Sequence, residues 1–390
     1  MILAALGALW WAAAVLTAAG IAYLLLVICA VVAWRPRTGP GWETAPSVTL
    51  LKPLCGFEDG LEEGIASFLG QQTTCPVRFV FGVADPRDPA LALARRVAAQ
   101  FPRTETCFVV DPRIHGPNPK VSNLINMAGE GLGEVVILSD SDTLIAPGAL
   151  QRAIDALATP GVGAVTALYR ARPGLPRDRM RSFGAWFLDY WFLPMATLHA
   201  RLSPLAVTYG PLTAIRGDLL AQVGGLEALA DHLSDDAELG RRVRASGHSI
   251  GFTPDVAETL VNDATHAELF DHELRWSRTV RGLDPLGFAA SLVSHLGPIP
   301  LLLLMRPGPI AALGIAMPIL LRWALVLSVE RRFGRADGLR RPGPFGLWWR
   351  DVYSFAVWVA AWGVARVGWR GQRLTVRDGD ILQATPEQAR

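Results

Sequence analysis

The stretch "GEVVILSDSDTLI", Gly133 to Ile145, decides how the middle of this 390-residue chain is expected to fold. It begins as a β-branched and aliphatic run typical of a buried strand, and it then places Asp140 and Asp142 one residue apart. Asp and Ser favour turns, so a solvated turn is one interpretation. In an extended segment, residues i and i+2 point the same way, so both carboxylates could face one hard divalent cation. We favour the metal interpretation because the pair ends a buried strand.

Similar runs on either side of this stretch predict the fold class. Residues 47–51, 77–83 and 161–168 also have the composition of strands, and helices are expected between them at 61–72 and 89–101. Strands separated by helices imply an α/β fold with a mostly parallel sheet and right-handed crossovers. In such sheets, ligands bind beyond the carboxyl ends of the strands, which is where the two aspartates lie.

The composition indicates a protein that is partly globular and partly membrane-bound. Hydrophobic residues make up 51% of the chain and charged residues 18%, which is oily for a soluble enzyme and mild for a pure membrane bundle. We expect a globular domain at 45–282. The net charge of +2 and the lack of a dense basic patch exclude nucleic acid as a partner. The four cysteines have neither metal-ligand spacing nor the density of a disulfide scaffold, and they suit a reducing cytosol.

The N-terminal segment predicts a membrane anchor over residues 1–34. Residues 2–34 carry no charge, which exceeds the roughly 20 residues that span a bilayer, and Arg35 and Arg37 follow directly. A cleavable signal peptide would instead have a basic start and a shorter apolar run. The flanking arginines place the following domain on the cytosolic side.

The C-terminal region, 286–369, is also apolar and precedes a tail at 370–390. It contains three apolar segments: 286–305, 309–329 and about 345–369. Pro298 and Pro300 interrupt the first, so a broken or surface-lying segment is as well supported as a span. Arginine-rich stretches on both sides of the last segment favour cytosolic positions, which one crossing cannot provide, so we expect that one of the three does not cross.

Two polar groups lie before the central aspartates. Asp85 and Asp88 in "FGVADPRDPA" follow a predicted strand, and the alternative to a binding role is a turn fixed by proline. Lys120 in "NPKVSNL" stands between Asn118 and Asn123, in an expected loop at the sheet edge. It is one of only two lysines in the chain. It is either a solvated lysine or a counter-charge for phosphate.

Two further groups follow the aspartates. In "HLSDDAELGRRV", Ser234 and the acidic residues after it have the composition of a helix start, but Asp235 or Asp236 could instead be a base for an acceptor hydroxyl. The stretch "HELRWSRTVRG" contains His272, Arg275 and Trp276, followed by Arg278 and Arg281. This basic, aromatic segment is either an interfacial membrane anchor or a binding site for a diphosphate leaving group.

In this order, the motifs resemble a known family. Asp85, Asp140 within DSD, Asp236 within SDDAE, and a motif ending in Arg275-Trp276 match the D, D, D, (Q/R)XXRW pattern of membrane-bound family 2 and family 21 glycosyltransferases. The similarity covers about 48–282 together with the terminal membrane helices, and it includes "LLKPLCG" and "GPLTAIRGDLL". It is strongest to ceramide glucosyltransferases and to bacterial hopanoid-biosynthesis glycosyltransferases. The last motif departs from the pattern in beginning with His rather than Gln or Arg.

The resemblance implies a GT-A fold and an inverting, metal-dependent transfer from a nucleotide sugar. The roles it implies are these: Asp85 contacts uridine, Lys120 lies near the nucleotide, Asp140 and Asp142 organise Mg²⁺ or Mn²⁺ at the diphosphate, Asp236 is the base, and Arg275 with Trp276 secures the departing nucleotide and the acceptor side. Such chemistry needs a base and electrostatic relief for the leaving diphosphate, not a covalent nucleophile.

The acceptor implied by the resemblance is a membrane lipid. The aromatic stretch at 182–202 would either dock the domain on the bilayer or pack in a core. The expected acceptor is a hopanoid polyol glycosylated from UDP-GlcNAc at the bacterial inner membrane. Ceramide with UDP-glucose is the alternative substrate pair. A processive polysaccharide synthase and a non-catalytic membrane binding protein or transporter are the other classes left open.

Overall fold

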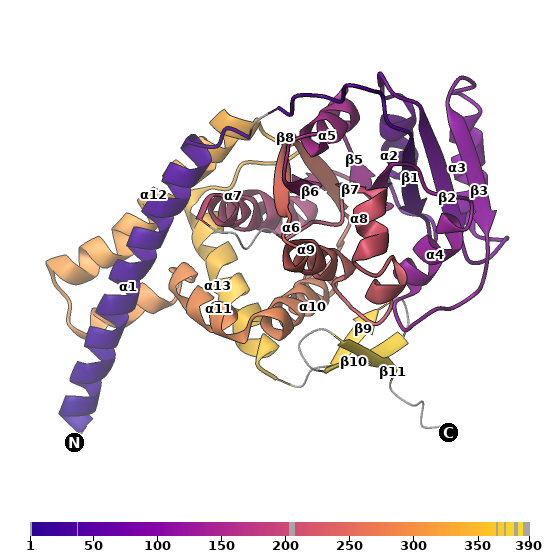
Figure 1. The fold of residues 1–390 in the computed structure, drawn as a ribbon. Coiled ribbons are helices and arrows are strands. Elements are labelled where there is room, and N and C mark those ends of the chain that lie inside the picture. The colour runs from indigo at the N-terminus through magenta and orange to yellow at the C-terminus, as the bar shows by residue number, and fades with distance from the viewer. Residues whose placement is uncertain are drawn as a thin grey trace, which may run out of the picture. The chain divides into compact units, whose positions relative to one another are not determined.

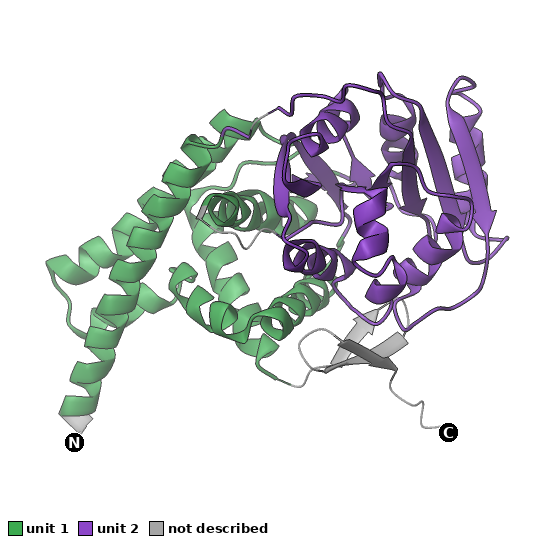
Figure 2. Cartoon of the chain, viewed as in Figure 1, with its two compact units in different colours: residues 1–34, 177–201, 263–380 green, residues 35–176, 202–262, 381–390 purple. Residues whose placement is uncertain are grey.

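A computed structural model describes residues 2–36, 38–202, 207–363, 366–369, 372–377 and 381–384. The chain divides into two compact units, which are described separately (Figure 2). Unit 1 comprises residues 1–34, 177–201 and 263–380, and unit 2 comprises 35–176, 202–262 and 381–390.

Unit 2 is built on an eight-stranded sheet with the order β3-β2-β1-β4-β7-β6-β8-β5. In chain order the strands are β1 (Val48–Pro53), β2 (Val77–Val83), β3 (Glu105–Val110), β4 (Val135–Leu138), β5 (Thr143–Leu144), β6 (Val162–Pro173), β7 (Thr213–Arg216) and β8 (Ser249–Val261). β1 pairs in parallel with β2 and β4, β2 with β3, and β6 with β8. β7 is antiparallel to both β4 and β6, and β5 is antiparallel to β8. The predicted mostly parallel α/β sheet is therefore confirmed.

Helices cover both faces of this sheet because the central strands are apolar on both sides. Leu50 and Ile137 belong to the core under α2 (Leu61–Leu69), α3 (Pro89–Ala98) and α5 (Ala149–Leu157). Leu51 and Val136, the next or preceding residues along the same strands, belong to the opposite core. That core includes residues of four helical elements: α4 (Pro119–Ala128), α8 (Gly217–Gln222), η2 (Glu227–Leu229) and α9 (Asp235–Ala245). A strand buried on both faces has a continuous hydrophobic run, as observed in the sequence.

Unit 1 is mainly helical (Figure 1). Its elements are α1 (Ile2–Val32), α6 (Arg179–Phe187), the π-helix η1 (Leu188–Phe192), α7 (Leu193–Leu202), α10 (His266–Leu283), α11 (Pro285–Ala290), η3 (Ser291–Ser294), η4 (Ile299–Met305), α12 (Pro309–Phe333), α13 (Pro344–Ala361) and the antiparallel strands β9 (Arg366–Trp369) and β10 (Gln372–Arg377). A further strand, β11, spans Ile381–Ala384.

Two described helices are long and apolar enough to cross a membrane: Ala4–Val32 within α1, and α12. They lie side by side in Figure 1, and the Trp10 indole donates to the carbonyl of Leu303 in the neighbouring η4 at 3.1 Å. The first expected C-terminal segment is broken, because its two helical parts are bent by 55°. The third forms α13 and then β9, so it is not one continuous helix.

The aromatic stretch at 182–202 packs into the interior of unit 1. Phe183, Tyr190 and Trp191 are buried, as is Leu193. The Tyr190 hydroxyl donates to Glu330 of α12 at 3.0 Å, within the same unit. Of the two interpretations of this stretch, core packing therefore accounts for these side chains.

Candidate active site

The end of β4 carries the two central aspartates at the carboxyl edge of the sheet. The backbone N–H of Asp140 donates to the carbonyl of Gly210 at 3.2 Å, and a Cβ at Gly210 would lie only 2.2 Å from Asp140 Oδ2. A side chain at position 210 would therefore displace the Asp140 carboxylate. Ser141 and Asp142 form a turn and not the extended segment that we expected, so alternation along a strand does not align the two carboxylates.

Lys120 joins carboxylates from two parts of the chain. Its Nζ lies 2.7 Å from Oδ1 of Asp140 and 2.8 Å from Oδ2 of Asp235. Burial acts to lower the pKa of Lys120, but the charges of Asp140, Asp235 and Asp236 outweigh burial and raise it, so the lysine stays protonated. We call Lys120, Asp140, Asp142, Asp235 and Asp236 the Lys120 cluster.

Helix starts position the lysine and the later acidic pair. Lys120 lies in the first turn of α4 rather than in the expected loop, because Asn118 caps this helix and Pro119 starts it. Oδ1 of Asn118 accepts from the N–H of Val121 at 3.1 Å, and its Nδ2 donates to the carbonyl of His232 at 2.7 Å. The second bond ties the start of α4 to the segment that leads into α9.

Asp236 lies in the first turn of α9 and is half-buried. Its Oδ2 accepts from the N–H of Gly210 at 3.0 Å, and its Oδ1 accepts from the N–H of Ala237 at 2.8 Å and from the Ser234 hydroxyl at 3.1 Å. Burial and the charge of Asp235 raise the pKa of Asp236 to about 6, against the charge of Lys120. A carboxylate with this pKa is ionised at neutral pH and is a stronger base than a solvated aspartate.

The structure corrects the expected capping roles at this helix start. Ser234 occupies the N-cap position without a side-chain capping bond, and its hydroxyl bonds Asp236. Asp235 binds Lys120. Asp236 instead accepts a backbone N–H of its own helix. The local pattern could not show this, because the attraction of Lys120 for Asp235 is a long-range contact.

Asp142 lies in the turn after Asp140 and contacts β8. Its Oδ2 accepts from the Thr259 hydroxyl of β8 at 2.5 Å. Burial and the charge of Asp140 raise the pKa of Asp142, against the hydrogen bond from Thr259 and the charge of Lys52. The two central carboxylates are therefore close enough to repel one another, as expected for groups that share a cation.

Lys52, for which the sequence predicted no role, holds this turn through hydrogen bonds. It lies on β1, is fully buried, and its Nζ donates to the carbonyl of Asp140 at 2.5 Å, to the Ser139 hydroxyl at 3.2 Å and to the carbonyl of Thr143 at 3.5 Å. Burial lowers the pKa of Lys52 to about 7, against the charges of Asp142 and Asp140. A lysine inside the apolar run "VTLLKP" was the available signal, because lysine is almost never fully buried without partners.

Asp85 lies beyond the end of β2, at the same edge of the sheet. Its described hydrogen bonds are with Arg87, whose backbone N–H and guanidinium lower the pKa of Asp85. Asp88 caps α3 by accepting from the N–H of Ala90 at 2.8 Å, and it also accepts from the N–H of Gly56. Asp88 is thus a helix cap, a role that the expected proline-fixed turn did not specify.

The His272–Trp276 motif lies on α10 in unit 1. Nδ1 of His272 is 3.2 Å from Oδ2 of Asp263, and its ring lies 4.2 Å from that of Trp276. The Phe187 ring stacks with the Trp276 ring at 6.4 Å. Arg275 is half-buried on the same helix. The motif is thus held by aromatic packing within its own unit.

Arg350 anchors the same helix to α13. It is fully buried, it pairs with Glu273, and its guanidinium lies over the rings of Phe183 and Phe187 at 5.0 and 5.2 Å. A buried arginine balanced by one carboxylate and stacked on aromatic rings fixes the position of α10 within unit 1.

The carboxylates at the sheet edge supply part of the oxygen coordination that a hard cation needs. Among the described residues, no three His, Cys, Asp or Glu side chains are grouped to hold a metal ion. Asp140 and Asp142 offer two carboxylates, and a divalent cation there would take its remaining oxygen ligands from a diphosphate and water.

A comparison with protein families identifies the family to which this chain belongs. The family model described as glycosyl transferase family 21 matches residues 12–382. The chain belongs to glycosyl transferase family 21. The resemblance to family 21 that the motifs indicated is confirmed, and the expected likeness to hopanoid-biosynthesis glycosyltransferases stays a prediction.

Relatives of this family 21 chain support the same assignment. It is 30% identical over 143 residues to a ceramide glucosyltransferase of Gibberella zeae, covering 34% of this chain and 27% of the relative. It is 23% identical over 240 residues to ceramide glucosyltransferase 1 of Caenorhabditis elegans, covering 60% and 49%. The aligned parts thus span about half or less of these curated relatives.

A solved structure shows the fold. The mannosyltransferase PcManGT from Pyrobaculum calidifontis, in complex with GDP-Man and Mn²⁺, matches 91% of this family 21 chain and 99% of its own chain, with a TM-score of 0.54 and 23% identity. The expected mixed α/β, Rossmann-like GT-A glycosyltransferase fold is confirmed.

Proposed function

We propose that this family 21 protein transfers a single sugar from a nucleotide sugar to a hydroxyl of a membrane lipid, with inversion at the anomeric carbon. The observation that carries the proposal is the Lys120 cluster at the carboxyl edge of a GT-A sheet, with a half-buried Asp236 whose pKa is raised to about 6. The cluster combines the proposed base Asp236 with a protonated lysine and with the neighbouring carboxylates of Asp140 and Asp142.

The donor half of the proposal concerns the diphosphate. Asp140 and Asp142 would hold Mg²⁺ or Mn²⁺, which when bound draws negative charge away from the leaving diphosphate. Lys120 stays protonated and supplies a further positive charge to the phosphate oxygens. We also propose that Asp85 contacts the nucleoside. The complex of PcManGT with GDP-Man and Mn²⁺ supports a nucleotide sugar and a divalent cation.

The acceptor half is a proton transfer. Asp236 takes the proton of the acceptor hydroxyl as its oxygen forms a bond to the anomeric carbon and the bond from that carbon to the diphosphate breaks. The N–H groups of Gly210 and Ala237 hold the carboxylate in place for this step. Arg275 and Trp276 are proposed to secure the departing nucleotide; this role rests on the motif and not on a described contact.

The acceptor is proposed to be a hopanoid polyol and the donor UDP-GlcNAc, at the bacterial inner membrane with the catalytic domain cytosolic. Two helices apolar enough to cross a membrane support a lipid substrate. Ceramide with UDP-glucose is the second candidate pair, because the curated relatives are named ceramide glucosyltransferases. A processive synthase is disfavoured, since a polymer channel needs more spans than the two, or at most three, that the described residues supply.

The test is a transfer assay with purified protein in lipid nanodiscs. UDP-GlcNAc and UDP-glucose are each supplied with bacteriohopanetetrol and with ceramide, and the masses of the lipid products are determined by mass spectrometry. We expect one sugar on bacteriohopanetetrol from UDP-GlcNAc. A ceramide product from UDP-glucose would select the second pair. No lipid product from any combination, or a sugar polymer, would contradict the proposed function.

A further inference from the structure

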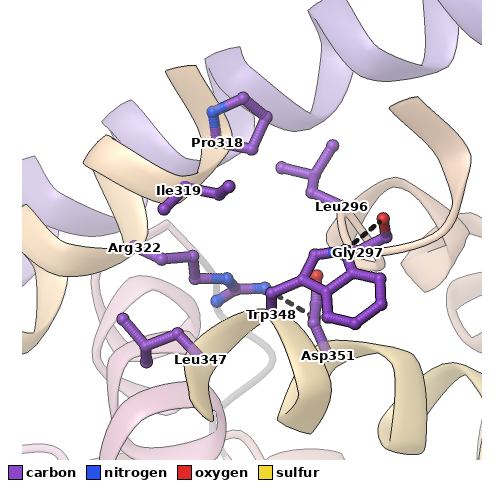
Figure 3. A pocket seen from close by; sticks show the side chains of 8 residues that line it. All are labelled: Leu296, Gly297, Pro318, Ile319, Arg322, Leu347, Trp348 and Asp351. Atoms are coloured by element: carbon purple, nitrogen blue, oxygen red, sulfur yellow. Dashed lines mark hydrogen bonds and ion pairs between the residues drawn. The ribbon is translucent and has the colours of Figure 1, made fainter. Parts of the chain in front are cut away.

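A pocket within unit 1 contains a buried ion pair that the proposed mechanism does not use. Figure 3 shows it between α12, α13 and the segment that precedes η4, with Arg322 and Asp351 among its lining side chains. Arg322 lies in the middle of α12, a helix apolar enough to cross a membrane. Ionisable residues in such helices face the protein interior and commonly mark binding sites.

The two charges are held by several contacts within unit 1. The side chains of Arg322 and Asp351 are 7% and 4% exposed, and their closest nitrogen and oxygen are 3.4 Å apart. Trp191 donates to Oδ1 of Asp351 at 2.9 Å, and its ring lies 4.6 Å from the Arg322 guanidinium. Arg322 also donates to the carbonyl of Ser294 at 2.7 Å. These contacts stabilise the ion pair against the desolvation cost of burying its two charges.

Arg322 and Asp351 retain hydrogen-bonding capacity for a ligand. Nε of Arg322 is buried and has no partner among the described residues. Both described hydrogen bonds of Asp351 end on Oδ1, which leaves Oδ2 as an acceptor. A hydroxyl group satisfies both, because it accepts one hydrogen bond and donates another. The ion pair has no net charge and so offers no net attraction to an anion or a cation, which favours an uncharged group.

The walls and size of the pocket narrow the class of ligand. Leu296, Pro318, Ile319 and Leu347 line it, so carbon atoms next to the hydroxyl meet apolar side chains. Its cavity volume is about 10 Å³. This is about the room that one water molecule takes, so the cavity suits a single hydroxyl group of a larger molecule.

We infer that the Arg322–Asp351 pocket binds one hydroxyl of a polyhydroxylated lipid headgroup. The inference deepens the proposed function and rests on it, because it gives the acceptor lipid a recognition point in unit 1 besides the reacting hydroxyl. It also gives the selectivity a physical cause. A lipid without this hydroxyl leaves a buried charged donor and acceptor unpaired, which sites of this kind penalise strongly.

The test compares lipid binding by the full-length protein and by two double variants in nanodiscs. Arg322→Met with Asp351→Asn removes both charges together and keeps a carbonyl oxygen for Trp191, so no unpaired charge is left buried. Glu330→Gln with Arg341→Gln is the matched control, since it removes another ion pair of unit 1 whose residues do not line the pocket.

Bacteriohopanetetrol, ceramide and their deoxy analogues are the probes, with affinity measured by native mass spectrometry. We expect the pocket variant to bind the hydroxylated lipid roughly tenfold to a hundredfold more weakly, and its deoxy analogue as the wild type does. The control variant should bind both as the wild type does. Unchanged binding by the pocket variant would overturn the inference and indicate a pocket that holds water only.

Two further readouts separate the possible failures. Wild-type protein alone must prefer the hydroxylated lipid over its deoxy analogue; equal affinities would overturn the inference even if the pocket variant did not fold. Release of UDP from the donor reports on the Lys120 cluster without reference to this pocket. A wild-type protein that binds lipid selectively but never transfers sugar would refute the proposed function and leave the hydroxyl site supported.

Discussion

Replacement of Asp236 by Asn removes the proposed base while keeping its size. The amide cannot take the proton of the acceptor hydroxyl, so turnover should fall by roughly 10²-fold to 10⁴-fold. Donor binding should change little, because Lys120 contacts Asp140 and Asp235 directly and does not depend on a bond to Asp236. The expected defect is therefore in the chemical step.

The structure also indicates that this variant folds. The pKa of Asp236 moves from 3.8 to about 6, so its ionised form at neutral pH costs the folded state on the order of 3 kcal/mol. Asn removes that cost. Its side chain has one acceptor oxygen, so the N–H of Gly210 or Ala237 loses a partner at a cost of about 1–3 kcal/mol. The two effects oppose one another, and the free energy of unfolding should change little.

The assay measures kcat, the affinity for the UDP-sugar and the melting temperature of Asp236→Asn beside Asp235→Asn. Asp235→Asn keeps an oxygen that can accept from Lys120 at the position of the present 2.8 Å contact, so it should retain substantial activity. Turnover of Asp236→Asn within a few-fold of the wild type would refute the assigned base. A comparable loss in Asp235→Asn alone would move that role to Asp235.

Three further predictions follow from the same cluster and its support. The transfer rate should fall as the pH drops through about 6, where Asp236 becomes protonated, and the residual activity of Asp236→Asn should not show this fall. Because the pKa of Asp236 is raised in the folded state, its contribution to stability is full below pH 4 and is lost as the pH rises through about 6. Unfolding curves across that pH range would show the change. EDTA should abolish transfer and added Mg²⁺ or Mn²⁺ should restore it, whereas full activity in EDTA would exclude the cation. Lys52→Met leaves the buried carbonyl of Asp140 without its donor, so it should lower stability by about 1–3 kcal/mol and weaken UDP-sugar binding roughly tenfold. The exposed-pair control Arg96→Met should cost at most about 1 kcal/mol, and equal melting temperatures of the two variants would contradict the support role of Lys52.

Much of the sheet could be predicted because its central strands are apolar on both faces. The runs at 47–51 and 77–83 form β1 and β2, and helices occur between strands where the sequence changes to a period of 3.6. β7 was not predicted, since four residues, Thr213–Arg216, are too few to show a period. Its antiparallel place between β4 and β6 depends on long-range pairing.

The candidate site was predicted in composition but not in geometry. The start of α4 was mistaken for a loop, although Asn118 before Pro119 is a recognisable helix start. The contact of Lys120 with Asp235 could not be predicted, because 115 residues separate them and no local pattern encodes their pairing. Lys52 was missed for a different reason: strand periodicity assigns its position to the core, and only its three hydrogen bonds show why a charge lies there.

The anomeric configuration of the glycolipid product tests the proposed transfer most directly. Purified protein is given an α-linked UDP-sugar and a polyhydroxylated lipid, and the linkage in the product is determined by NMR. A single displacement with Asp236 as base predicts one sugar per lipid in the β configuration. An α-linked sugar, or no lipid-linked sugar at all, would contradict the account.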